Sequence, residues 1–137
     1  MAGDRVLIVL DDTFDAPSVD LPEWARAAAQ NAADLHVIAP YIGSRLSVAT
    51  ADDEPRRQAA RRLAIATEHM KSLGVHPVGS VSADSPFEAI TTYLLDHEVD
   101  RIVLAVTADG HWREKGLIEK VRGATNALVQ ELPVINS

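Results

Sequence analysis

The chain has 137 residues, the length of a single domain, and it contains no cysteine, which excludes disulfides and thiolate chemistry. Hydrophobic residues make up 47% of the sequence, as expected for a globular protein rather than a disordered one. The formal net charge of -7 argues against nonspecific binding to nucleic acid, because such binding depends on neutralising phosphates. No apolar run approaches the roughly 20 residues of a membrane span, and the first residues lead into a strand rather than a signal peptide, so we expect a cytoplasmic protein.

The first half of the chain alternates between apolar runs and helical segments. Residues 5–10 predict a strand buried on both faces, and Asp11 follows it directly. Residues 23–33 are rich in helix formers and predict a helix, with Asp20 placed to cap it. A second strand is expected over residues 35–39.

The next segment predicts a long helix followed by a weak strand. Residues 53–73 have apolar positions at helical spacing, and Gly74 is placed to end this helix. Residues 75–81 predict a third strand. Because Pro77 and Gly79 weaken strand pairing, we expect this strand at an edge of the sheet.

The clearest local signal follows the third strand. Ser85 is typical of a helix N-cap, Pro86 of the first helical position, and Glu88 of a capping box. The helical pattern continues toward Asp100. The apolar run at residues 102–106 then predicts a fourth strand covered on both faces, which completes one arm of a β-α-β unit.

The chain is expected to end with a helix over residues 117–131 and a short strand over residues 133–136. Strands and helices therefore alternate throughout residues 1–137. Such alternation predicts an α/β fold: a single domain with a three-layer, doubly wound, five-stranded and mainly parallel sheet.

Short motifs along nearly the whole chain resemble those of the universal stress protein family, in the family's order and spacing. The matching segments are the strand that ends at Asp11, Leu35-His36-Val37, Ala83-Asp84-Ser85-Pro86, Val99-Asp100 before strand four, and Pro133-Val134-Ile135. The resemblance implies the strand order 3-2-1-4-5, shared with the adenine nucleotide α-hydrolase-like fold. It also implies a homodimer that pairs through the C-terminal strand.

The family's nucleotide motif, Gly-x2-Gly-x9-Gly-(Ser/Thr) after strand four, is not intact here. Counted from strand four, its glycine positions fall on Ala105, Ala108 and Ile118. Counted by spacing, Gly110 and Gly123 occupy the first and third positions, whereas Arg113 and Ala124 replace the second glycine and the hydroxyl residue. A β-carbon where glycine is needed blocks close approach to phosphate, so we expect ATP binding to be weak or absent.

A ligand site is still expected at the carboxyl ends of strands one and four, where the connections of a doubly wound sheet diverge. The candidate binding residues are Asp11, Asp12, Thr13, Val37, Val106, Thr107, Gly110, Arg113 and Gly123. The resemblance implies that Asp11 hydrogen-bonds an adenine or a ribose; the alternative is that it caps loop amides. Arg113 either clamps a phosphate or stays solvated, and Trp112 either stacks on a base or packs on the domain or a partner subunit.

Catalytic and metal sites have little support in the sequence. Asp11 and Asp12 are adjacent carboxylates, but no third ligand for Mg²⁺ accompanies them. His36 is interpreted as a core histidine, and no nucleophile elbow or Walker loop is present. We therefore expect no catalytic constellation and no metal, and ATP or AMP is the one cofactor class under consideration.

Two functions remain. The first is a dimeric, regulatory stress-response protein that acts through contacts with protein partners and binds ATP weakly or not at all. The alternative is a nucleotide-binding module that uses residues 107–124 as a variant phosphate loop. A third reading, an adenine nucleotide α-hydrolase enzyme, lacks the serine-glycine loop expected after strand one.

Overall fold

Five parallel strands form one sheet in the order β3-β2-β1-β4-β5. The computed structural model describes residues 4–10, 30–41, 54–72, 74–106 and 116–133. Its strands are β1 (Arg5–Leu10), β2 (Asp34–Pro40), β3 (Val78–Ser82), β4 (Arg101–Val106) and β5 (Leu128–Pro133). Its helices are α3 (Glu54–Ser72), α4 (Pro86–Asp96) and α5 (Leu117–Ala124). The predicted α/β class, the strand order and the edge position of the third strand are confirmed.

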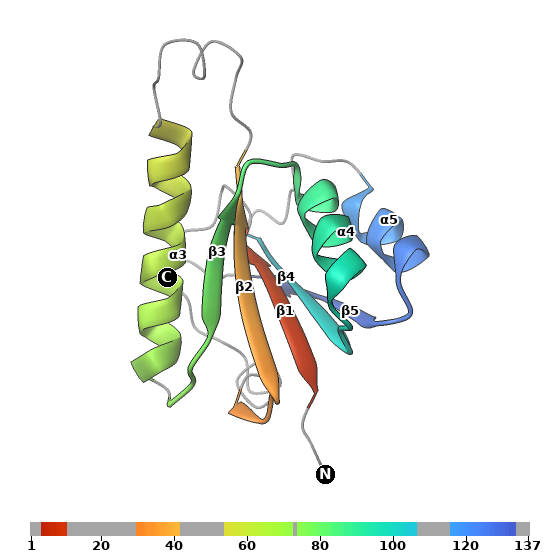
Figure 1. Cartoon of the computed structure of the whole chain (residues 1–137), viewed down its shortest axis with the longest axis horizontal. Helices are drawn as coiled ribbons and strands as arrows, with labels where there is room; N and C mark the ends of the chain where they lie inside the picture. The colour runs from red at the N-terminus through yellow and green to blue at the C-terminus, as the bar shows by residue number, and fades with distance from the viewer. Residues whose placement is uncertain (1–3, 11–29, 42–53, 73, 107–115, 134–137) are drawn as a thin grey trace.

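Strand β1 lies at the centre of the sheet and is buried on both faces. Val6, Ile8 and Leu10 pack in a cluster with Ala59, Ala66 and Met70 of α3. Leu7 and Val9 pack in the opposite cluster, with Ile90 of α4 and Val121 of α5. Figure 1 shows the resulting layers, with α3 on one face of the sheet and α4 and α5 on the other. The unbroken apolar run of β1 is explained by these two cores.

The long helix α3 ends as its sequence predicts. Gly74 has a φ of 84°, in the left-handed region that a side chain rarely tolerates. The N–H of Gly74 donates to the carbonyl of Lys71 at 3.0 Å, and the N–H of Val75 to that of Met70 at 3.1 Å. These bonds satisfy carbonyls that the end of the helix would otherwise leave unpaired.

The cap of α4 is also confirmed. The Ser85 hydroxyl accepts a hydrogen bond from the N–H of Glu88 at 3.3 Å, and Pro86 occupies the first turn. The helix ends at Asp96, and the extended His97 leads toward β4. Because β3 precedes α4 and β4 follows it, α4 carries the chain from the carboxyl edge of the sheet back to its amino edge.

The expected last helix and strand were wrong in their bounds. Helix α5 ends at Ala124 rather than at residue 131, and β5 covers Leu128–Pro133 rather than residues 133–136. Thr125 is already extended, with φ of -149° and ψ of 155°. Gly123 and β-branched Thr125 are weak helix formers, and Leu128 pairs with Arg101 of β4. Pairing with β4 therefore makes this segment a strand, although its apolar pattern also fits a helix.

Among the helices that the structure describes, none is both long enough and apolar enough to cross a membrane.

Gly79 lets α3 approach β3 closely, and this contact predicts a measurable cost for a methyl group. A Cβ at residue 79 would lie 2.9 Å from Cδ1 and 3.1 Å from Cγ of Leu63. We expect Gly79→Ala to lower the free energy of unfolding by about 1–3 kcal/mol, measured by urea denaturation, because overpacking displaces a side chain.

Gly123→Ala is the matched control for Gly79→Ala, because a Cβ at residue 123 meets nothing within 4 Å. The substitution also replaces a glycine in a helix by a better helix former. It should leave the free energy of unfolding unchanged or raise it by up to about 1 kcal/mol. The Gly79→Ala cost should shrink when Leu63→Ala is already present. An equal cost in both backgrounds would contradict the packing explanation.

Candidate functional site

The carboxyl edge of the sheet contains the switch point of this fold, between β1 and β4. Leu10 at the end of β1 pairs with Ala105, next to the end of β4. The chain runs outward from β1 to β2 and β3, and then returns to β4 on the other side of β1. The connections that follow β1 and β4 therefore diverge, which leaves a crevice at this edge in folds of this class.

The structure describes three of the predicted binding residues. Val37 is fully buried in the core of β2, in the cluster that packs against α3. Val106 is the last residue of β4 and reaches the carboxyl edge. Gly123 is exposed in the last turn of α5. Six further candidates lie outside the described residues: Asp11, Asp12, Thr13, Thr107, Gly110 and Arg113.

The structure does not bring Gly123 together with Val106. Helix α5 follows β4 and returns the chain to the start of β5, so its last turn lies toward the amino edge of the sheet. A different glycine, Gly116, stands at the helix start that faces the carboxyl edge. It is the N-cap of α5, with a left-handed φ of 69°. Sequence reasoning missed its role, although its place directly before the expected helix start at residue 117 was a usable signal.

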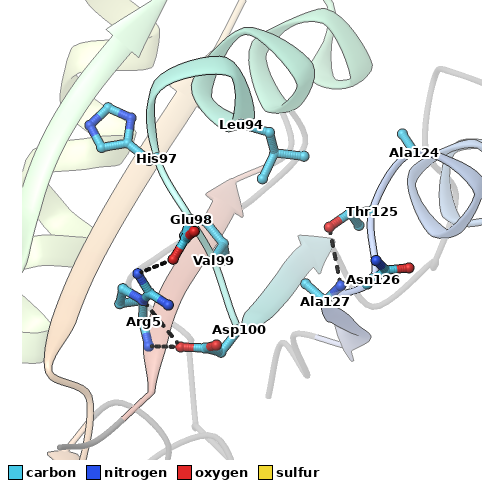
Figure 2. A pocket seen from close by; sticks show the side chains of 10 residues that line it. All are labelled: Arg5, Leu94, His97, Glu98, Val99, Asp100, Ala124, Thr125, Asn126 and Ala127. Carbon is cyan, nitrogen blue, oxygen red and sulfur yellow. Dashed lines mark hydrogen bonds and ion pairs between the residues drawn. The ribbon is translucent and has the colours of Figure 1, made fainter.

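A second polar arrangement lies at the opposite, amino edge. Figure 2 shows a hollow lined by the start of β1, by the α4–β4 connection and by the α5–β5 connection. Arg5 donates from Nη1 to Oε2 of Glu98 at 2.9 Å and from Nε to Oδ2 of Asp100 at 3.3 Å. The same Asp100 oxygen accepts the backbone N–H of Arg5 at 2.9 Å. These bonds therefore join Arg5, the first residue of β1, to Asp100, the residue directly before β4.

The charges in this hollow stabilise one another. Hydrogen bonds to Glu98 and then to Asp100 raise the pKa of the Arg5 guanidinium. The backbone N–H and then the side chain of Arg5 lower the pKa of the Asp100 carboxyl. Sequence reasoning did not select these residues. They were findable, because the starts of neighbouring parallel strands meet at one edge of a sheet, and Arg5 and Asp100 stand at the starts of β1 and β4.

A group of aromatic and hydroxyl side chains lies between the sheet and α4. The imidazole Nε2 of His36 lies 2.9 Å from the hydroxyl of Ser80 across β2 and β3. Its ring lies 4.9 Å from the Tyr93 ring, which stacks on His97 at 4.1 Å. Burial, and then the charge of His97, lower the pKa of His36. Burial, and then Asp34, raise the pKa of Tyr93.

This group has a structural explanation rather than a catalytic one. A serine nucleophile needs a base that is itself oriented by a third group. Among the described residues, His36 bonds to the Ser80 hydroxyl and to no carboxylate. The hydroxyl therefore satisfies a half-buried imidazole. The described residues also contain no group of three metal-binding side chains.

Comparison with solved structures identifies the fold. A universal stress protein from Archaeoglobus fulgidus in complex with dAMP has a TM-score of 0.68 at 16% identity, covering 96% of this chain and 99% of that one. A second structure of universal stress protein from the same organism gives a TM-score of 0.67 at 15% identity, covering 94% and 98%. A universal stress protein in complex with cAMP gives 0.63 at 18% identity, covering 98% and 99%.

These similarities show that the chain has the universal stress protein fold over nearly its whole length, as the sequence motifs predicted. No family model matches the sequence, and no curated protein matches it either.

The lowered pKa of His36 predicts a pH-dependent stability. The unfolded chain binds a proton at His36 near the ordinary pKa of 6.5, whereas the folded chain does so only at lower pH. Stability should therefore be fully present above pH 6.5 and fall as the pH drops toward the folded value. We expect His36→Gln, which cannot titrate, to lose less stability than the unmodified chain between pH 7.5 and pH 5 in urea denaturation.

His76→Gln is the control, because His76 is exposed. It should follow the unmodified chain across the same pH range. If His36→Gln and His76→Gln show the same pH dependence, the burial of His36 is not its cause.

Proposed function

We propose that this chain is a regulatory domain of the universal stress protein type that binds adenine nucleotides weakly, and ATP least of all. The proposed site is the carboxyl edge between β1 and β4. The observation that carries the proposal is the strand order β3-β2-β1-β4-β5, which creates a switch point there in a chain with the fold of nucleotide-bound neighbours.

The phosphate end of the proposed site is the reason that we expect weak affinity. Ala105 is the last residue of β4 that pairs with β1, it stands where one register of the motif requires glycine, and its side chain is buried. Asp12 and the net charge of -7 add repulsion against a triphosphate, although salt screens it beyond about 8 Å. A monophosphate carries less charge and needs fewer backbone contacts, so it should lose less affinity than ATP.

The alternative is a true nucleotide-binding module with a variant phosphate loop in residues 107–124, but without Gly123, because the last turn of α5 lies away from the carboxyl edge. Two observations favour keeping it. The neighbours include complexes with dAMP and cAMP. In addition, helix α5 begins at Leu117, directly after its N-cap Gly116, and the N–H groups of a helix's first turn favour an anion. In this alternative, the positive charges of Arg113 and Lys115 compensate for the backbone contacts to phosphate that are lost with the missing glycines.

The nucleotide proposal predicts a dissociation constant for ATP with Mg²⁺ well above micromolar in isothermal titration calorimetry. AMP should bind at least as tightly as ATP, because the altered positions affect the outer phosphates most. Arg113→Ala should change neither affinity by more than about threefold. Submicromolar ATP binding that Arg113→Ala abolishes would overturn this proposal and support the variant phosphate loop.

We also propose that the chain forms a two-fold homodimer through β5. Strand β5 is a sheet edge, and such edges pair readily with another chain. The backbone N–H of Leu128 donates to the carbonyl of Asp100, next to β4, at 3.0 Å. Because strand residues alternate in direction, the N–H of Glu131 then points away from β4 toward the open edge.

The dimer proposal predicts that Glu131→Pro gives a monomer by sedimentation velocity, whereas the unmodified chain is a dimer. Proline at this position removes an outward N–H without removing a bond to β4. Glu131→Thr changes the same side chain but keeps the N–H, so it should remain dimeric. A monomeric unmodified chain would refute the dimer, and a dimeric Glu131→Pro would refute pairing through β5.

A further inference from the structure

The hollow at the amino edge is large enough to receive side chains of another molecule. It measures about 560 Å³, and Figure 2 shows Leu94 above it, Arg5, Glu98 and Asp100 on one side and Thr125 to Ala127 on the other. A neighbouring hollow of about 210 Å³ has four residues in common with it: Arg5, His97, Glu98 and Val99. The two hollows therefore adjoin these residues, and together they are called the amino-edge hollow.

The lining of the amino-edge hollow consists mainly of apolar and acidic side chains. Leu94, Val99, Ala124 and Ala127 contribute apolar surface. Asp34, Asp96, Glu98 and Asp100 contribute four carboxylates, against the single guanidinium of Arg5. The last turn of α4 also carries no basic residue, so its negative end adds to the same field. The hollow therefore attracts cations.

We propose that the amino-edge hollow is a docking surface for a basic segment of a partner protein. The methylene stem of an arginine or lysine would lie on the apolar lining while its cation reaches Glu98 and Asp100. Arg5 contacts Oε2 of Glu98 and Oδ2 of Asp100. As far as the described residues reach, the second oxygen of each carboxylate is left to the incoming cation.

The exposure of the two carboxylates decides between a protein segment and a small amine. The side chains of Glu98 and Asp100 are 83% and 45% exposed. A single exposed ion pair contributes too little binding free energy to hold a free amine. A segment with several basic residues adds such contacts together, and the net charge of -7 attracts it from a distance.

The docking surface is independent of the proposed nucleotide site, because the two lie at opposite edges of the sheet. Its failure would leave the nucleotide proposal untouched, and the reverse is also true.

The test is a nuclear magnetic resonance titration of the full ¹⁵N-labelled chain with a capped eight-residue peptide of alternating arginine and alanine. Amide shifts should concentrate at residues 94–100 and 124–127. Glu98→Lys should raise the dissociation constant at least tenfold. Glu119→Lys makes the same charge change at an exposed residue of α5 and should alter it less than twofold.

Four results would overturn the proposal. Shifts spread over the whole acidic surface, or equal weakening by both lysine variants, would indicate nonspecific attraction. Arginine amide binding the same residues as tightly as the peptide would indicate a small-molecule site. Unchanged spectra at millimolar peptide would exclude docking of this chemistry. Glu98→Gln makes a smaller charge change, and it should raise the dissociation constant of the peptide less than Glu98→Lys does.

Discussion

The burial of β1 on both faces is the constraint on which the rest of this structure depends. Leu7 and Val9 are completely buried, and Leu10 is 1% exposed. A strand with parallel neighbours on both sides requires helical crossovers that cover both faces of the sheet. The chain must then leave β1 in one direction and return on its other side. The switch point between β1 and β4, and with it the proposed nucleotide edge, follows from how the core is built.

The two edges of the sheet are therefore suited to different tasks. At the amino edge, backbone bonds hold the strand starts together: the N–H of Asp100 donates to the carbonyl of Arg5 at 2.9 Å, and the N–H of Leu128 donates to that of Asp100 at 3.0 Å. The exposed ion pairs of Arg5 add little to this. Because these bonds lie at the amino edge, the proposed weakening of nucleotide binding at the carboxyl edge requires none of them to change.

The sequence predicted those helices and strands whose ends are marked by a local signal. The apolar run of residues 5–10 predicted the bounds of β1, and single residues predicted the Ser85 cap of α4 and the glycine end of α3. The end of α5 was not, because Leu128 and Val129 fit a helical spacing as well as a strand, and only pairing with β4 decides between them. The meeting of Arg5 and Asp100 was predictable from the parallel order of β1 and β4, but the hollow was not, because it also depends on where α4 and the α5–β5 connection pack. Most predicted nucleotide-binding residues lie outside the described residues and stay predictions.

Mapping AMP onto the chain by nuclear magnetic resonance tests the central claim most directly, because it asks which edge of the sheet receives the nucleotide. With millimolar AMP, we expect amide shifts at Leu10, Ala105 and Val106, and none at Arg5, Asp100 or Asn126. Shifts confined to the amino edge, or no shift at all, would contradict the assignment of nucleotide binding to the switch point between β1 and β4.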